Sequence, residues 1–183
     1  MANAIDKIVD HATGIHGRAS TGLRSTQFRR QDEPLGTGLE PDCSFLIGER
    51  VYGYIAALKH GEAAAEAFIL ETPPDLVVEV ELTHAETGKP ERYGQLGVSE
   101  IWLLNANAKR EIVGAEFLAL HPLNAPQAIQ VSRVLPGIKP AQIVKAIEGV
   151  RLAATREERW AAVEHVIGKR GAVRIEDESA AYA

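Results

Sequence analysis

The clearest pattern along the chain is an alternation of apolar and acidic positions over residues 75–81, which read DLVVEVE. β-branched residues suit a strand, and side chains of a strand point to opposite faces in turn. Leu76, Val78 and Val80 therefore share one face. Glu79 and Glu81 lie side by side on the other. Burying an unpaired charge costs several kcal/mol, so a divalent cation, a cationic side chain or solvent must compensate these carboxylates.

The same periodicities predict the other elements. Residues 48–70 are alanine-rich, but Gly53 and Gly61 interrupt them, and we interpret this segment as an insertion or a hairpin followed by a helix. Thr155 and Glu158 have the spacing of a capping box, which predicts the start of the last helix. The remaining predicted elements are helices over 1–15, 91–96, 138–150 and 156–167, and strands over 42–47, 100–104, 111–120 and 128–134.

Length and composition predict one globular domain. The chain has 183 residues, of which 45% are hydrophobic, and this is enough for a core. We expect the domain to span residues 1–170, followed by a flexible tail over 171–183. A net charge of −5 argues against a protein that coats nucleic acid by bulk charge.

Cysteine usage and hydropathy indicate a cytoplasmic protein. Cys43 is the single cysteine, so no internal disulfide can form, which fits a reducing compartment. A small buried hydrophobe is the favoured interpretation of Cys43, and a catalytic thiol is the alternative. The sequence holds no apolar run of the ~18 residues that a membrane span needs, and its N-terminus lacks the apolar segment of a signal peptide.

Motifs exclude several kinds of chemistry. The sequence has no histidine pair at helical zinc spacing, no Cys-x-x-Cys, no glycine-rich phosphate loop and no serine elbow. Oxygen ligands remain, namely Asp42, Glu79 and Glu81, with Lys89 just beyond them. Carboxylates suit Mg²⁺ or Mn²⁺, which can activate water and bind a phosphoryl oxygen. The alternative is a set of edge carboxylates beside a surface lysine.

A second candidate feature is a basic stretch between residues 18 and 31. It is either a solvated face or a patch that faces nucleic-acid phosphates. Its cationic residues are Arg18, Arg24, Arg29 and Arg30.

Several separated segments resemble the Uma family, which has the PD-(D/E)xK restriction-endonuclease-like fold. The resemblance runs from about residue 20 to about residue 150 and rests on the order of its pieces. It implies an α/β core with a central mixed β-sheet flanked by helices. It also implies that Asp42 is the PD aspartate and Glu79 the first acid of (D/E)xK, both of them metal ligands. The segments are 38–45, 73–81, 89–93, 97–98, 100–102 and 134–137.

Three departures from the family pattern stand out. Glu81 occupies the position of the motif lysine, where it could add a metal ligand but cannot act as a lysine. Lys89 matches a basic residue that the family often carries on the following helix, and it can replace that lysine by reaching back. The gap between Asp42 and Glu79 is long for a simple hairpin. The remaining departure is that the chain looks N-terminally shortened, because the family usually has further strands and a helical glutamate before this region.

Two functional hypotheses follow. The first is a Mg²⁺- or Mn²⁺-dependent endonuclease, with Asp42, Glu79, Glu81 and Lys89 at the catalytic site and DNA as a candidate partner. The second is a catalytically inactive module on the same fold that binds nucleic acid or protein. The trimmed core also predicts a homodimer, because an exposed sheet edge or apolar face favours pairing.

Overall fold

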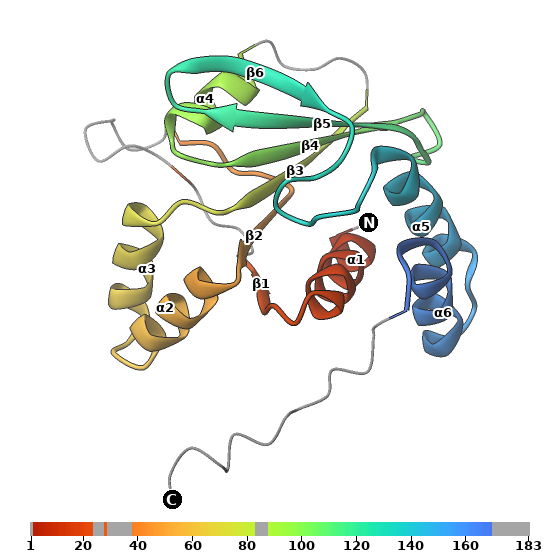
Figure 1. The fold of residues 1–183 in the computed structure, drawn as a ribbon, viewed down its shortest axis with the longest axis horizontal. Helices are drawn as coiled ribbons and strands as arrows, with labels where there is room; N and C mark the ends of the chain where they lie inside the picture. Colours follow the sequence, from red (N-terminus) through yellow and green to blue (C-terminus); the bar gives the residue numbers. More distant parts are fainter. Residues whose placement is uncertain (1, 24–27, 29–37, 83–87, 170–183) are drawn as a thin grey trace, which may run out of the picture.

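A six-stranded mixed β-sheet forms the centre of the part of the chain that the structure describes (Figure 1). This computed structural model describes residues 2–23, 28, 38–82 and 88–169. The strand order follows the sequence, and only β3 and β4 run parallel among the described strands. The strands are β1 (Ser20–Gly22), β2 (Cys43–Ile47), β3 (Leu76–Glu81), β4 (Glu100–Ala106), β5 (Ile112–His121) and β6 (Asn124–Ile129).

Helices cover both faces of this sheet, as the family resemblance implied for an α/β core. One face packs against α1 (Ala2–Ile15), α5 (Pro140–Leu152) and α6 (Arg156–Ile167). The other packs against α4 (Lys89–Gln95), which makes the crossover that parallel strands require. The pair α2 (Glu49–Leu58) and α3 (Glu62–Glu71) lies beside the start of β3 (Figure 1).

The alternation in β3 is confirmed. Leu76 and Val78 are fully buried among the side chains of α1 and α5, and Val80 packs against the same cluster. Val77 lies on the opposite face, in a cluster with Tyr93 of α4. Because the faces alternate, Glu79 also points toward α4.

The predicted hairpin within residues 48–70 is wrong, because α2 and α3 fill this segment. Gly61 breaks the two helices apart with a φ of 106°, as its position suggested. Gly53 instead lies inside α2. A Cβ atom at Gly53 would be 2.8 Å from the Phe68 ring, so glycine permits the close approach of α3. Tertiary packing therefore explains a residue that looked like a helix breaker.

The strand predicted over 128–134 is displaced toward the N-terminus, because β6 ends at Ile129. Buried Glu100 accounts for this difference. Its Oε2 accepts hydrogen bonds from the amides of Arg133 at 2.8 Å and Val134 at 3.2 Å. These amides therefore bond a side chain, in a loop, instead of pairing with a neighbouring strand. Glu100 Oε1 accepts a bond from the Trp102 indole at 2.6 Å.

The capping box at the start of α6 is confirmed. Thr155 Oγ1 accepts a hydrogen bond from the amide of Glu158 at 3.1 Å, and the Glu158 carboxylate accepts one from the amide of Thr155 at 3.1 Å. The amides of Thr155 and Ala154 lower the pKa of Glu158 by bonding its ionised form. In the described residues, no helix combines the length and the apolar character that crossing a bilayer requires. The predicted tail over 171–183 lies outside these residues.

Candidate active site

Asp42, directly before β2, and Glu79 of the neighbouring strand β3 lie at the same end of the sheet. Cys43 of β2 pairs with Val78 of β3, so the preceding Asp42 lies next to Glu79. Asp42 Oδ2 accepts a hydrogen bond from the amide of Val80 at 2.8 Å, which fixes its carboxylate against β3. Asp42 is exposed, whereas Glu79 is only 4% exposed. The pair therefore joins a buried carboxylate to one that solvent and ligands can reach.

Two side chains of α4 hold the buried Glu79 carboxylate. The Tyr93 hydroxyl donates a hydrogen bond to Glu79 Oε1 at 2.6 Å, and Lys89 Nζ lies 2.9 Å from Oε2. Residues four apart on a helix share a face, which explains why Lys89 and Tyr93 reach one carboxylate together. Burial and the bond to Glu79 raise the pKa of Tyr93 far above its usual value, so its hydroxyl stays protonated and acts as a hydrogen-bond donor.

Lys89 therefore lies where the resemblance placed a substitute for the motif lysine. Its ammonium compensates the charge of Glu79, the second of the three possibilities that the sequence left open. The catalytic role of Lys89 stays a prediction.

Glu81 lies one strand repeat beyond Glu79 on the same face of β3. Partial burial raises its pKa, the positive charge of Lys89 opposes this shift, and the carboxylates of Glu79 and Glu116 add to it. Glu81 therefore shares an electrostatic environment with Glu79 and Lys89, two of the other residues predicted to be catalytic. Its assignment as a metal ligand and catalytic residue stays a prediction.

The carboxylate oxygens suit an open Mg²⁺ or Mn²⁺ site, which water and substrate complete, better than a closed site built from protein ligands alone. Within the described residues, no three His, Cys, Asp or Glu side chains are grouped to hold a metal. Proteins often bind Mg²⁺ through only one or two carboxylates, with water and substrate phosphates completing the shell. An ionised carboxylate offers about four lone-pair sites, so Glu79 keeps acceptor capacity beside Tyr93 and Lys89. Asp42 and Glu79 thus form a donor set that a metal-bound substrate could complete.

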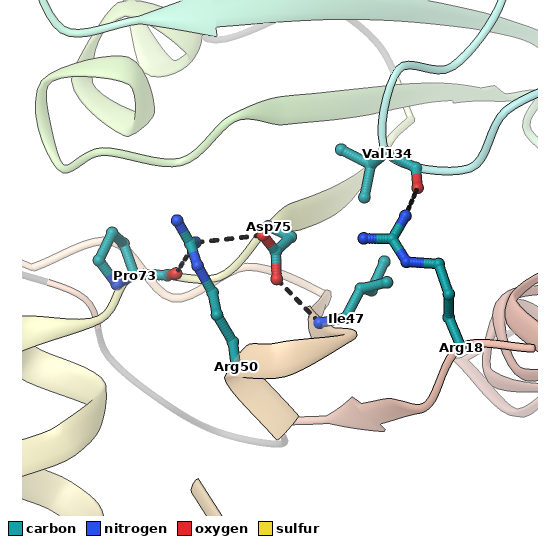
Figure 2. Close-up of polar contacts among 6 residues, drawn as sticks. All are labelled: Arg18, Ile47, Arg50, Pro73, Asp75 and Val134. Carbon is teal, nitrogen blue, oxygen red and sulfur yellow. Dashed lines mark hydrogen bonds and ion pairs between the residues drawn. The ribbon is translucent and has the colours of Figure 1, made fainter. Parts of the chain in front are cut away.

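Arg18 lies at the other end of β3, away from these carboxylates. Its Nη1 donates a hydrogen bond to the carbonyl of Val134 at 3.2 Å (Figure 2). Its charge acts on Asp75, which precedes β3. Glu79 is four residues further along, or about 13 Å at ~3.3 Å per residue. The other predicted phosphate contacts, Arg24, Arg29 and Arg30, lie outside the described residues.

Asp75 forms a polar junction that the sequence did not predict (Figure 2). Its Oδ2 accepts a hydrogen bond from the amide of Ile47 at 2.8 Å, and its Oδ1 lies 3.2 Å from Arg50 Nη1. Arg50 also donates to the carbonyl of Pro73 at 2.7 Å. Burial raises the pKa of Asp75 despite the opposing effects of the Ile47 amide and Arg50. Asp75 thus joins the end of β2, the start of α2 and the start of β3.

Tyr93 is the site residue that sequence reasoning overlooked. The available signal was its position, because it follows Lys89 by four residues, the spacing that places two side chains on one face of a helix. An aromatic hydroxyl on the same helical face as the lysine could have been assigned to the same carboxylate.

Comparison with known proteins identifies the family. No curated protein and no solved structure matches the chain. A family model does match, over residues 2–153, and its description is "Putative restriction endonuclease". This match covers most of the chain and agrees with the mixed sheet and its flanking helices. The chain belongs to the Uma2 family.

Proposed function

We propose that this protein is a metal-dependent endonuclease that hydrolyses phosphodiester bonds, with Asp42 and Glu79 as ligands of Mg²⁺ or Mn²⁺. The observation that supports this most is the convergence of two strands and one helix on Glu79. Asp42 comes from the start of β2, Glu79 from β3, and Lys89 from α4. Family membership supports the same reaction class.

The side chains have distinct roles in this proposal. When bound, the metal activates a water molecule and stabilises charge on the phosphoryl group. Asp42 presents a carboxylate that the amide of Val80 already orients. Tyr93 and Lys89 hold Glu79 in one position. Lys89 also provides positive charge beside the reacting phosphate, and Glu81 assists at the edge of the site.

The test compares metal binding and cleavage in matched variants. We expect Glu79→Gln and Asp42→Asn to abolish Mn²⁺-dependent cleavage of plasmid DNA and to remove the rise in melting temperature that Mn²⁺ causes in the wild type. Glu66→Gln is the control, because it removes one negative charge from an exposed position on α3, outside the candidate site. Cleavage that survives Glu79→Gln would refute the assignment.

A second candidate function is a catalytically inactive module that binds nucleic acid or protein. One observation favours it, namely that Lys89 already neutralises Glu79 without a metal. The acid at position 81, where the motif has lysine, points the same way. This candidate predicts no stabilisation by Mn²⁺ in either the wild type or Glu79→Gln.

A further inference from the structure

A hollow of about 660 Å³ lies between α1, α5 and the start of β5, on the face of the sheet opposite α4. Its walls carry four cationic side chains and two acidic ones, so the lining has a positive balance in a chain whose net charge is −5. Aliphatic side chains of α5 and β5 line the space between these charges. The cationic residues are Lys7, Arg110, Arg151 and Arg159, and the acidic residues are Glu111 and Glu148.

A second hollow, of about 290 Å³, adjoins the candidate active site. Asp42 and Val80 line it, and so does Arg110. Arg110 therefore lines both hollows, and it is the residue that the positively charged lining shares with the hollow beside Asp42. The two hollows share Arg110, and we call the surface that they line together the Arg110 path.

Arg110 occupies an unusual backbone conformation. Its φ is 60°, and among the described residues it is the only one other than glycine with a positive φ. Asn107 holds the surrounding turn, since its side-chain oxygen accepts hydrogen bonds from the amides of Lys109 and Glu111. Glycine would adopt this conformation at lower cost. Strained residues that persist are concentrated at functional sites, and the backbone at position 110 fits this pattern.

The charges along the path are not all neutralised internally. Arg151 lies 3.6 Å from Glu111, and Lys7 lies over the Trp160 ring. Within the described residues, no carboxylate forms an ion pair with Arg110 or Arg159. These two guanidinium groups are therefore available to an external anion. Guanidinium groups match phosphate geometry and bind it through paired hydrogen bonds.

We propose that the Arg110 path binds the phosphate backbone of DNA and guides it toward Asp42. The proposal rests on the endonuclease function and adds the surface that holds the substrate. Arg110 contacts the phosphate nearest Asp42, and Arg159 contacts one further along, beyond α5. The aliphatic wall between them faces the sugars. The path differs from the basic stretch at residues 18–31, because Arg18 lies at the opposite end of β3.

The test uses two substitutions in one turn. Arg110→Gly removes the side chain and relieves the backbone, so we expect the melting temperature to stay the same or rise. Lys109→Ala is the matched control, because this substitution also removes one positive charge from an exposed position. Lys109 lines neither hollow. DNA binding is measured by fluorescence anisotropy with a labelled 30-base-pair duplex in EDTA, which prevents cleavage.

We expect Arg110→Gly to weaken DNA binding by at least about threefold and to reduce the slope of log K against log salt by about one, as for one lost phosphate contact. Adding Arg159→Gln should weaken binding by about tenfold in total. Lys109→Ala should change both quantities much less. Equal effects of Arg110→Gly and Lys109→Ala would overturn the proposal, as would a wild type that does not bind the duplex at 50 mM salt.

Two further measurements separate the alternatives. Poly-glutamate is added as a competitor at equal charge concentration, and equal displacement of DNA would show a surface for acidic protein segments and overturn the proposal. Cleavage is measured in parallel with Mn²⁺. Cleavage by the wild type, together with unchanged binding by Arg110→Gly, would refute the path and leave the endonuclease function standing. Weaker binding by Arg110→Gly in a protein that never cleaves would support the path and count against the endonuclease.

Discussion

Burial of Glu79 determines what the side chains around it must do. A carboxylate that is only 4% exposed is stable when each oxygen has a donor, and here Tyr93 and Lys89 provide one each. The two donors differ in kind. Lys89 carries the compensating charge and is itself partly exposed, whereas Tyr93 is fully buried and neutral. Tyr93 therefore acts as a positioning residue, through Glu79.

Removing the Tyr93 hydroxyl tests this role. We expect Tyr93→Phe to weaken Mn²⁺ binding by about 10- to 100-fold, as is typical when a metal ligand loses its supporting hydrogen bond. The cost in unfolding free energy should be about 1–3 kcal/mol, because a buried carboxylate oxygen loses its donor. Calorimetry measures the first quantity and urea unfolding the second.

The control for Tyr93→Phe is Tyr52→Phe, since Tyr52 is 58% exposed on α2. It should leave both quantities unchanged. Normal Mn²⁺ affinity in Tyr93→Phe, with the expected loss of stability, would show that Tyr93 serves the fold alone.

Asp75 leads to a prediction about pH. Its folded-state pKa is raised above the usual 3.8, so the folded protein binds a proton there more tightly than the unfolded chain. Stability from this group is therefore fully present below pH 3.8 and falls as pH rises through the folded-state pKa. We therefore expect the unfolding free energy of the wild type, minus that of Asp75→Asn, to decrease as pH rises over this range. Urea unfolding from pH 3.5 to 7 measures it, and a difference that increases with pH would contradict the assignment.

At the scale of elements, local patterns predicted most of the structure. The alternation in β3 and the capping box of α6 are each specified by a few adjacent residues, and both are confirmed. The predictions that were wrong depend on residues far apart in sequence. Gly53 lies within a helix because Phe68 packs against it, and residues 131–134 form a loop because Glu100 bonds to it. Long-range contacts of this kind leave no local signal.

The prediction of the site was incomplete for the same reason, because local patterns do not show contacts between residues far apart in the sequence. Asp42, Glu79 and Lys89 were selected by motif order, and the structure brings their elements together. The junction at Asp75 was overlooked because its partners are the amide of Ile47 and the side chain of Arg50. Neither partner belongs to a recognisable sequence motif.

The contact between α2 and α3 can be tested directly. Glycine-to-alanine changes inside helices usually stabilise a protein by about 1 kcal/mol. At Gly53 we expect the opposite, a loss of about 1–3 kcal/mol, because the new Cβ atom would force the Phe68 ring to move.

A second substitution provides the control for Gly53→Ala. Phe68→Leu removes the far end of the ring, so Gly53→Ala should be neutral or stabilising in that background. Thermal melts of the two single variants and the double variant measure this coupling. Additive effects would show that the contact does not limit position 53.

For the whole molecule, the distribution of charge matters more than its total. The net charge of −5 suggests that bulk attraction to nucleic acid is weak. It did not predict the Arg110 path, whose cations come from four separate parts of the sequence. Folding brings α1, α5, α6 and the β4–β5 turn together, and only then do these charges form one surface.

The expected homodimer is the remaining prediction at this scale, and β6 is the element that we propose for its interface. β6 ends the strand order, so its outer edge carries backbone groups that a second chain can pair with, except at Pro126, which has no amide. Leu123, just before β6, is 87% exposed, and burying it would favour association. Light scattering should give twice the 19.8 kDa of one chain.

Charge on the β6 edge should dissociate this dimer. We expect Ala125→Lys combined with Ala128→Lys to give a monomer, because both residues are exposed on β6 and lysines there oppose strand pairing. Leu152→Lys is the control, since Leu152 is 67% exposed at the end of α5, away from this edge. A wild-type monomer at every concentration would refute the dimer, and a dimer that only Leu152→Lys dissociates would refute the β6 interface. Because the candidate active site and the Arg110 path lie at other parts of the fold, the monomeric variant should retain DNA binding.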